Sequence, residues 1–183
     1  MFIRNTASGY GVVSRVFHWF MAVAIVAMFG LGWWMVRLDY YSPYYNSAPD
    51  LHRSVGIVLL AVLVLRWVWR LANINPDDGE LSALERIGSK IVHVAFYPLL
   101  LAMMLSGYFI STSDGRPIDV FGLFSVPSVI ADKAMTDTAG YIHKSLAYIT
   151  IALAAVHTVA ALKHHFVDRS RILKRMWSGP PGA

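Results

Sequence analysis

Four long stretches of apolar residues alternate with shorter polar segments along the chain. Each stretch is about as long as a helix must be, at ~1.5 Å per residue, to cross an ~30 Å hydrocarbon layer. Two of the cations inside the second stretch, Arg53 and Arg66, stand near its ends, where long side chains extend to the polar interface. The pattern therefore predicts four membrane-spanning helices, at residues 16–38, 52–71, 91–110 and 142–162.

The connections between these spans differ in character. Residues 39–51 contain four tyrosines and two prolines, which is typical of the interface between lipid and water. Residues 111–141 form the longest connection, and residues 119–130 within it mix apolar side chains with few charges. We expect this stretch to lie in the interface or to cap the bundle. Pro98 removes one backbone donor from the third span, which a membrane helix tolerates.

Composition supports a membrane protein. The 183 residues are 56% hydrophobic and 15% charged, whereas soluble domains are about 25% charged. The first apolar stretch is too long for a signal peptide and no small-residue cleavage site follows it, so we expect it to remain in the mature protein. We predict a single all-α domain over residues 1–183, an integral membrane four-helix bundle.

The absence of cysteine excludes several kinds of metal site. Disulfides, iron–sulfur clusters, thiolate-bound metals and haem attached through Cys-x-x-Cys-His all need this residue. The formal net charge is +5, but the basic residues flank the apolar stretches instead of forming a groove-sized patch. We therefore expect lipid contacts and no binding of nucleic acid.

The distribution of lysine and arginine predicts the orientation in the membrane, because positive segments are retained in the cytoplasm. With both termini cytoplasmic, eleven basic residues lie on the cytoplasmic side: Arg4, Arg15, Arg66, Arg70, Arg86, Lys90, Lys163, Arg169, Arg171, Lys174 and Arg175. Five lie on the opposite side: Arg37, Arg53, Arg116, Lys133 and Lys144. We therefore predict a multi-pass membrane protein with both termini in the cytoplasm.

Four histidines inside the spans are candidates for function, because ionisable side chains are rare there. His143 and His157 are 14 residues apart on the fourth span, which places them within about 40° of the same helix face and ~21 Å apart along the axis. His18 begins the first span on the cytoplasmic side, and His52 begins the second span on the other side. Matching depths predict two pairs, His18 with His157 and His52 with His143.

Each predicted pair fits haem better than zinc. A structural zinc site needs four ligands and a catalytic site needs three, whereas each depth offers two histidines and no carboxylate. Two imidazoles on opposite faces of a planar macrocycle complete six-coordinate iron, which then transfers single electrons. The four histidines therefore predict axial ligation of iron in two b-type haems, stacked across the bilayer.

Other polar residues near these depths suggest further contacts. Three cations within three positions of a paired histidine either bind haem propionates or extend to the interface: Arg15, Arg53 and Lys144. His93 lies near the cytoplasmic start of the third span, and we consider it as a haem or quinone contact. His164 and His165 follow the fourth span, and a protonatable His164 suits quinone reduction because the quinone takes up protons.

Several short motifs resemble one known family. They are residues 14–19 (SRVFHW), 51–56 (LHRSVG), 93–98 (HVAFYP), 162–166 (LKHHF) and 171–176 (RILKRM), with His143, Lys144 and His157 between the third and fourth. In these motifs, and over essentially its whole length, the chain resembles the bacterial cytochrome b561 family of small dihaem membrane proteins. The resemblance implies axial ligands at His18, His52, His143 and His157, the same four residues that the depth argument selects.

The resemblance also implies a function. It predicts an oxidoreductase that moves electrons between a periplasmic donor and membrane ubiquinone, with superoxide as the donor in the best-understood branch. An alternative is a cytochrome b anchor subunit that passes electrons from a partner dehydrogenase or hydrogenase to quinone. The short loops offer little docking surface, so we expect that no protein partner is required. A third alternative is a haem-free protein that carries metal ions on its histidines.

Overall fold

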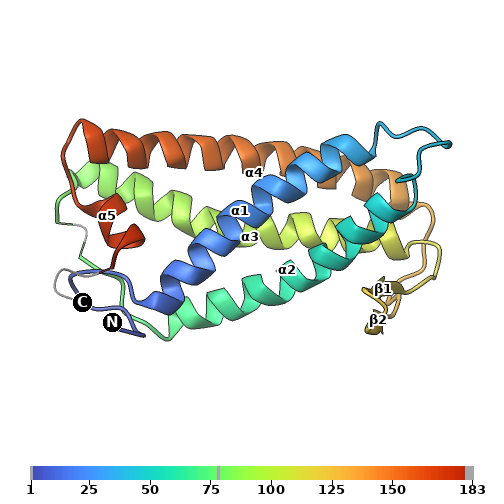
Figure 1. Cartoon of the computed structure of the whole chain (residues 1–183), viewed down its shortest axis with the longest axis horizontal. Helices are drawn as coiled ribbons and strands as arrows, with labels where there is room; N and C mark the ends of the chain where they lie inside the picture. Colours follow the sequence, from blue (N-terminus) through green and yellow to red (C-terminus); the bar gives the residue numbers. More distant parts are fainter. Residues whose placement is uncertain (1, 78, 180–183) are drawn as a thin grey trace.

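The structure is a computed structural model that describes residues 2–77 and 79–179. Four long helices run through it: α1 (Val12–Met35), α2 (Ser47–Leu71), α3 (Ala83–Thr112) and α4 (Met135–Phe166). Each is long and apolar enough to cross a membrane. They lie side by side along the long axis, with both ends of the described chain at one end of the bundle (Figure 1). We call this end the termini end and the opposite one the hairpin end.

All four helices begin before the apolar stretches that predicted them, whereas α1 ends at Met35, three residues before the predicted end. α3 begins at Ala83, eight residues before the predicted start at position 91. At this start the Ser82 side chain accepts a hydrogen bond from the backbone N–H of Glu85, and the Glu85 carboxylate accepts one from the backbone N–H of Ser82. Such a capping box supplies partners for backbone donors that a helix start leaves unpaired. α3 then continues through Pro98, and α4 begins at Met135. Hydropathy marks the part of a helix suited to lipid and does not mark where the helix itself ends.

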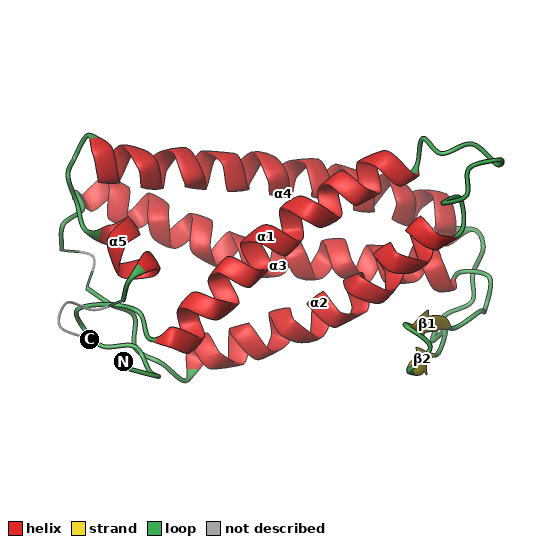
Figure 2. Cartoon of the chain, viewed as in Figure 1, coloured by secondary structure: helices red, strands yellow, loops and turns green. Residues whose placement is uncertain are grey.

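The expectation of an all-α chain needs a small correction. Strands β1 (Ile118–Val120) and β2 (Phe124–Val126) form an antiparallel hairpin in the connection between α3 and α4. Phe121 and Gly122 at its turn both have positive φ angles, as a type I′ turn requires. The Ser54 hydroxyl donates to the Asp119 carbonyl at 3.0 Å and so ties the hairpin to α2. The hairpin thus caps one end of the bundle (Figure 2).

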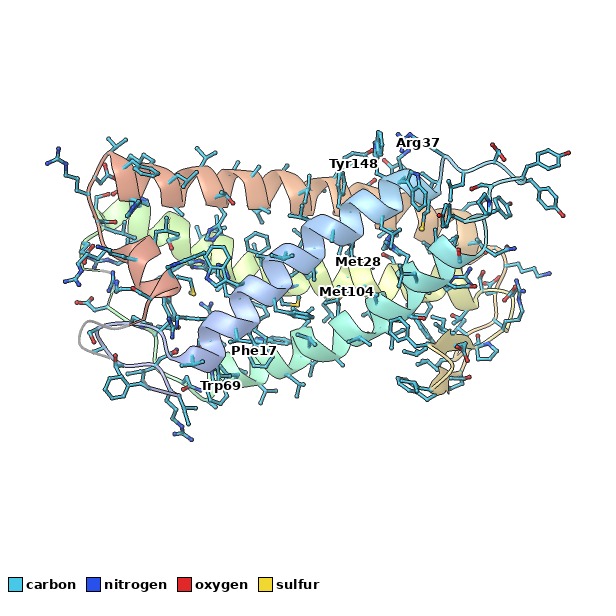
Figure 3. The ribbon with its side chains drawn as sticks, viewed as in Figure 1. Phe17, Met28, Arg37, Trp69, Met104 and Tyr148 are labelled. Atoms are coloured by element: carbon cyan, nitrogen blue, oxygen red, sulfur yellow. The ribbon has the colours of Figure 1, made fainter. Side chains whose placement is uncertain are left out.

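The tightly packed core lies midway along the bundle. Met21 of α1, Leu59 and Leu63 of α2, and Tyr97 and Leu100 of α3 form it. Figure 3 shows Met28 and Met104 nearby, both packed against this core. Many outward-facing apolar side chains are more than half exposed, including those of Val16, Val23 and Val26 on α1 and Leu65 on α2. Such a surface requires an apolar surrounding, which the membrane supplies.

A short helix, α5 (Ile172–Trp177), folds back onto the termini end. The indole N–H of Trp19 on α1 donates to the Met176 carbonyl at 3.1 Å, and the two rings of Trp19 and Trp177 are 5.2 Å apart. Arg15 also donates to the Trp177 carbonyl, at 2.9 Å. These contacts fasten the C-terminal segment beside the start of α1.

Candidate functional site

Two histidines from different helices face each other near the hairpin end. His52 lies near the start of α2, and His143 lies in the first third of α4. Their ring centroids are 6.2 Å apart and their planes are inclined by 81°. We call them the hairpin-end pair.

A second pair occupies the other end of the bundle. His18 lies near the start of α1 and His157 near the end of α4. Their ring centroids are 6.3 Å apart with planes inclined by 84°, almost the same arrangement as in the first pair. We call them the termini-end pair. The structure therefore brings together the same partners that matching depth selects.

The spacing within each pair suits one metal ion held between the rings. A metal–imidazole bond is about 2.0–2.1 Å long and the ring centroid lies about 1.1 Å behind the bonded nitrogen, so opposed rings have centroids about 6.2–6.4 Å apart. Both observed separations, 6.2 and 6.3 Å, match this value. The separation of the rings in each pair is therefore compatible with one metal ion bound by both imidazoles.

His143 is also held in the tautomer that a metal ligand needs. Its Nδ1 lies 2.8 Å from the backbone carbonyl of Met103. Because a carbonyl only accepts, Nδ1 carries the proton and Nε2 keeps the lone pair. A backbone carbonyl that binds the second ring nitrogen is the usual support of a metal-bound histidine. In His52, by contrast, the buried Nδ1 has no hydrogen-bond partner among the described residues.

Glycines on neighbouring helices make room for the hairpin-end rings. A Cβ atom at Gly107 of α3 would lie 2.9 Å from Cε1 of His143, and one at Gly32 of α1 would lie 3.2 Å from Cε1 of His52. Both distances are shorter than ordinary van der Waals contact. Each imidazole therefore packs directly on the backbone of the adjacent helix, which fixes its position.

An apolar cavity surrounds the hairpin-end pair. About 750 Å³ of space beside the pair is not filled by protein atoms, and part of this space is open to the surroundings of the bundle. All four long helices and β1 line it, with side chains that include those of Met28, Phe29, Arg53, Gly56, Met104, Ile118 and Ala147. The cavity contains few polar groups besides the two histidines and Arg53, as expected of a site for a large apolar cofactor.

The termini-end pair has aromatic and histidine neighbours. The ring of His93 on α3 lies 5.1 Å from that of His157, and Phe96 lies 6.0 Å from it. Trp19 lies 5.4 Å from His18. His93 therefore belongs to this cluster, in agreement with its expected depth.

Arg66 is a residue of this cluster that the sequence analysis interpreted differently. Instead of extending to the interface, its guanidinium points into the bundle, with Nη2 3.3 Å from Nδ1 of His18. The Tyr97 hydroxyl also lies beside it. The sequence does place an arginine at the depth of the termini-end pair. Hydropathy alone, however, does not reveal whether its side chain points into the bundle or to the interface.

The three cations considered as possible propionate partners have different surroundings. Arg15 donates to the Trp177 carbonyl, and its buried Nε has no partner among the described residues. Arg53 lines the cavity and forms an ion pair with Asp50 at 3.3 Å. Lys144 is exposed on α4. Arg53 alone of these three lines the described cavity.

His164 belongs to a charged network at the termini end. Its Nδ1 lies 2.7 Å from a carboxylate oxygen of Asp168. The Nζ atom of Lys163 lies between two carboxylates, 2.9 Å from an oxygen of Asp168 and 2.7 Å from an oxygen of Glu85. The Lys163 ammonium and His164 hold the pKa of the Asp168 carboxyl below its usual value. Glu85, His164 and Asp168 are close enough together to share a metal ion, but the Lys163 ammonium already pairs with both carboxylates. The neighbouring His165 has a buried Nδ1 without a partner among the described residues.

Comparison with known proteins identifies the family. A family model described as prokaryotic cytochrome b561 matches residues 9–179. The chain belongs to the prokaryotic cytochrome b561 family. Cytochrome b561 homolog 2 of Escherichia coli (strain K12) is 47% identical over 180 residues, which covers 96% of this chain and 95% of that protein. A probable superoxide oxidase, CybB, of Yersinia pestis is 25% identical over 170 residues, 91% of this chain and 94% of that protein.

Membership of the cytochrome b561 family confirms the resemblance seen in the motifs and implies haem b as the cofactor. It also makes the four long apolar helices the membrane spans of a prokaryotic membrane cytochrome. The two histidine pairs, the spacing of their rings and the cavity around one of them suit this cofactor.

Proposed function

We propose that this cytochrome b561 protein binds two haem b groups and carries electrons through the membrane between a periplasmic donor and ubiquinone. His52 and His143 would hold one haem, and His18 and His157 the other. The observation that carries the proposal is the equal spacing of the two pairs, 6.2 and 6.3 Å, at the distance set by two metal–imidazole bonds. Each haem supplies an iron centre that accepts and releases one electron.

The protein places around these sites groups that would fix the ligands. The Met103 carbonyl orients His143, and the glycine contacts hold both hairpin-end rings. Two histidines would hold each iron, and a haem held in this way would supply single-electron transfer. The two pairs are about 21 Å apart along α4, at opposite ends of its apolar part, which supports conduction from one membrane face to the other.

The basic residues support an orientation in the bacterial inner membrane with the termini end in the cytoplasm. The hairpin end would then face the periplasm. A reporter enzyme that is active only in the periplasm, fused after Val126 of the hairpin or after Trp177, tests this. We expect activity from the hairpin fusion alone; activity from the C-terminal fusion would contradict the orientation.

We propose that ubiquinone reacts at the termini end. Reduction of the quinone consumes protons, and this end contains the protonatable groups best placed to supply them. His93 lies against the termini-end pair, and His164 with Asp168 lies where α3 and α4 reach the membrane surface. A His164→Ala variant should therefore reduce quinone more slowly, whereas an unchanged rate would exclude His164 from proton supply.

Superoxide is the donor we propose to test first, since a relative bears the name probable superoxide oxidase. The basic residues near the hairpin end should attract the superoxide anion only modestly, because two of them are paired with carboxylates. Arg53 pairs with Asp50, and Arg116 pairs with Asp114 at 2.6 Å. The Arg116 guanidinium accordingly lowers the pKa of the Asp114 carboxyl.

Purified protein in lipid nanodiscs with ubiquinone distinguishes the functions. Enzymatically generated superoxide should disappear faster with the protein present, and ubiquinol should form in proportion. A His52→Ala variant in matched nanodiscs provides the control. Co-purification of a stoichiometric dehydrogenase or hydrogenase, together with no intrinsic activity, would instead identify an anchor subunit.

A further inference from the structure

The guanidinium of Arg66 has no anionic partner in the described part of the chain. Its side chain lies inside the bundle and contacts the His18 ring and the Tyr97 hydroxyl, both of them neutral groups. Arg70, one turn further along α2, lies 5.7 Å from the Tyr97 ring centroid and likewise forms no ion pair with any described residue. A partly buried cation in a membrane protein normally pairs with an anion, because leaving water without one is costly.

The contact between Arg66 and His18 is incompatible with iron ligation by His18. A neutral imidazole has one nitrogen with a free lone pair and one that carries a proton. Arg66 only donates, so it needs the lone pair at Nδ1. If iron binds Nδ1, it displaces Arg66; if iron binds Nε2, then Nδ1 carries the proton and accepts nothing. In either case the guanidinium needs a new acceptor when His18 binds iron.

A haem brings such an acceptor, since it carries two carboxylate side chains. Arginine is well suited to this partner, because its planar donors match a carboxylate in a two-point contact. Arg66 and Arg70 are four residues apart and therefore project from the same face of α2. The hairpin-end pair differs, because its nearby cation, Arg53, is already paired with Asp50.

We propose that Arg66, assisted by Arg70, is the carboxylate-binding site for the propionates of the haem at the termini-end pair. This inference rests on the proposed function. It assigns to Arg66 the role that the sequence analysis considered for Arg15, whose described contact is instead with α5. Arg66 acts here as a positioning residue, because it holds the edge of the cofactor and does not bind the iron.

The test compares haem b with its dimethyl ester, in which both carboxylates are blocked. Full-length protein from haem-deficient cells is placed in nanodiscs in a His52→Ala background, which leaves the termini-end pair to be titrated. With Arg66 present, haem should bind about tenfold to a hundredfold more tightly than the ester, the range for a charged hydrogen bond. In Arg66→Met, haem should bind as weakly as the ester, and Arg66→Lys should recover part of the preference. Lys144→Met, which removes an exposed cation, should keep the full preference.

Equal binding of haem and ester with Arg66 present would overturn the inference, and so would an undiminished preference in Arg66→Met. If Arg66→Met does not fold, Arg66→Lys decides: because lysine lacks the two-point contact, an undiminished preference in this variant also overturns the inference. Failure of both compounds to bind would overturn the proposed function as well. Equal binding of haem and ester with Arg66 present, at normal haem content, refutes only the role of Arg66 and leaves the proposed function intact.

Discussion

Replacement of Gly107 by alanine tests how the protein positions His143. The added methyl group would lie 2.9 Å from Cε1 and 3.1 Å from Nδ1 of the imidazole, whereas ordinary contacts begin at 3.4 Å. The His143 ring must therefore move by about 0.5 Å from its position against the backbone of α3. This movement also strains the hydrogen bond from Nδ1 to the Met103 carbonyl, now 2.8 Å long.

The expected magnitude follows from three opposing effects. Overpacking costs about 1–3 kcal/mol, and the weakened hydrogen bond costs about 0.5–1.5 kcal/mol. Alanine favours the helix over glycine by about 1 kcal/mol. The net cost is about 0.5–3.5 kcal/mol, which corresponds to roughly 2-fold to 300-fold weaker haem binding at the hairpin-end pair.

Titration of the haem-free chain with haem b, followed by its absorption spectrum, measures this change. Gly88→Ala is the matched control, because Gly88 lies on the same helix and a Cβ atom there has no neighbour within 4 Å. The control should bind both haems normally and should be equally or slightly more stable. Normal affinity at both sites in Gly107→Ala would refute the claim that backbone contact positions His143.

Three further predictions concern other parts of the bundle. His157→Ala should lose the termini-end haem and keep the other one, as measured by haem per chain and by a redox titration with a single remaining midpoint. The Lys163 ammonium holds the pKa of Asp168 below its usual value of 3.8, so the stabilising contribution of this carboxylate is complete above pH 3.8 and is lost as the pH falls through the lowered value. Acidification below pH 3.8 should therefore lower the Tm of the wild type more than that of Lys163→Met, and equal decreases would contradict this. Trp19→Phe removes the hydrogen bond to the Met176 carbonyl, which is worth about 1 kcal/mol. Limited proteolysis should then cleave the C-terminal segment faster than in the wild type. An unchanged cleavage rate would show that this hydrogen bond does not hold α5 in place.

The sequence was sufficient to predict the four spans and to choose the histidine partners. Hydropathy determines which residues lie at which depth, and the 14-residue separation of His143 and His157 places one ligand at each level. Depth alone then matches His18 with His157 and leaves His52 for His143. These conclusions need no knowledge of how the helices are rotated.

Features that depend on helix rotation could not be predicted. The spans are apolar on most sides, so hydropathy gives little information about which face points inward. The contact of Gly107 with His143 and the inward direction of Arg66 both depend on that rotation. The hairpin was missed for a different reason, because strands of three residues are too short to show a period of two.

Quantification of haem in the purified chain tests the central claim most directly. Protein made in cells supplied with iron and haem precursor should contain about two b-type haems per chain, and a reduced-minus-oxidised spectrum should show the sharp bands of six-coordinate iron. A colourless preparation, or one haem per chain that survives His18→Ala and His52→Ala alike, would contradict the account of two histidine pairs that each hold a haem.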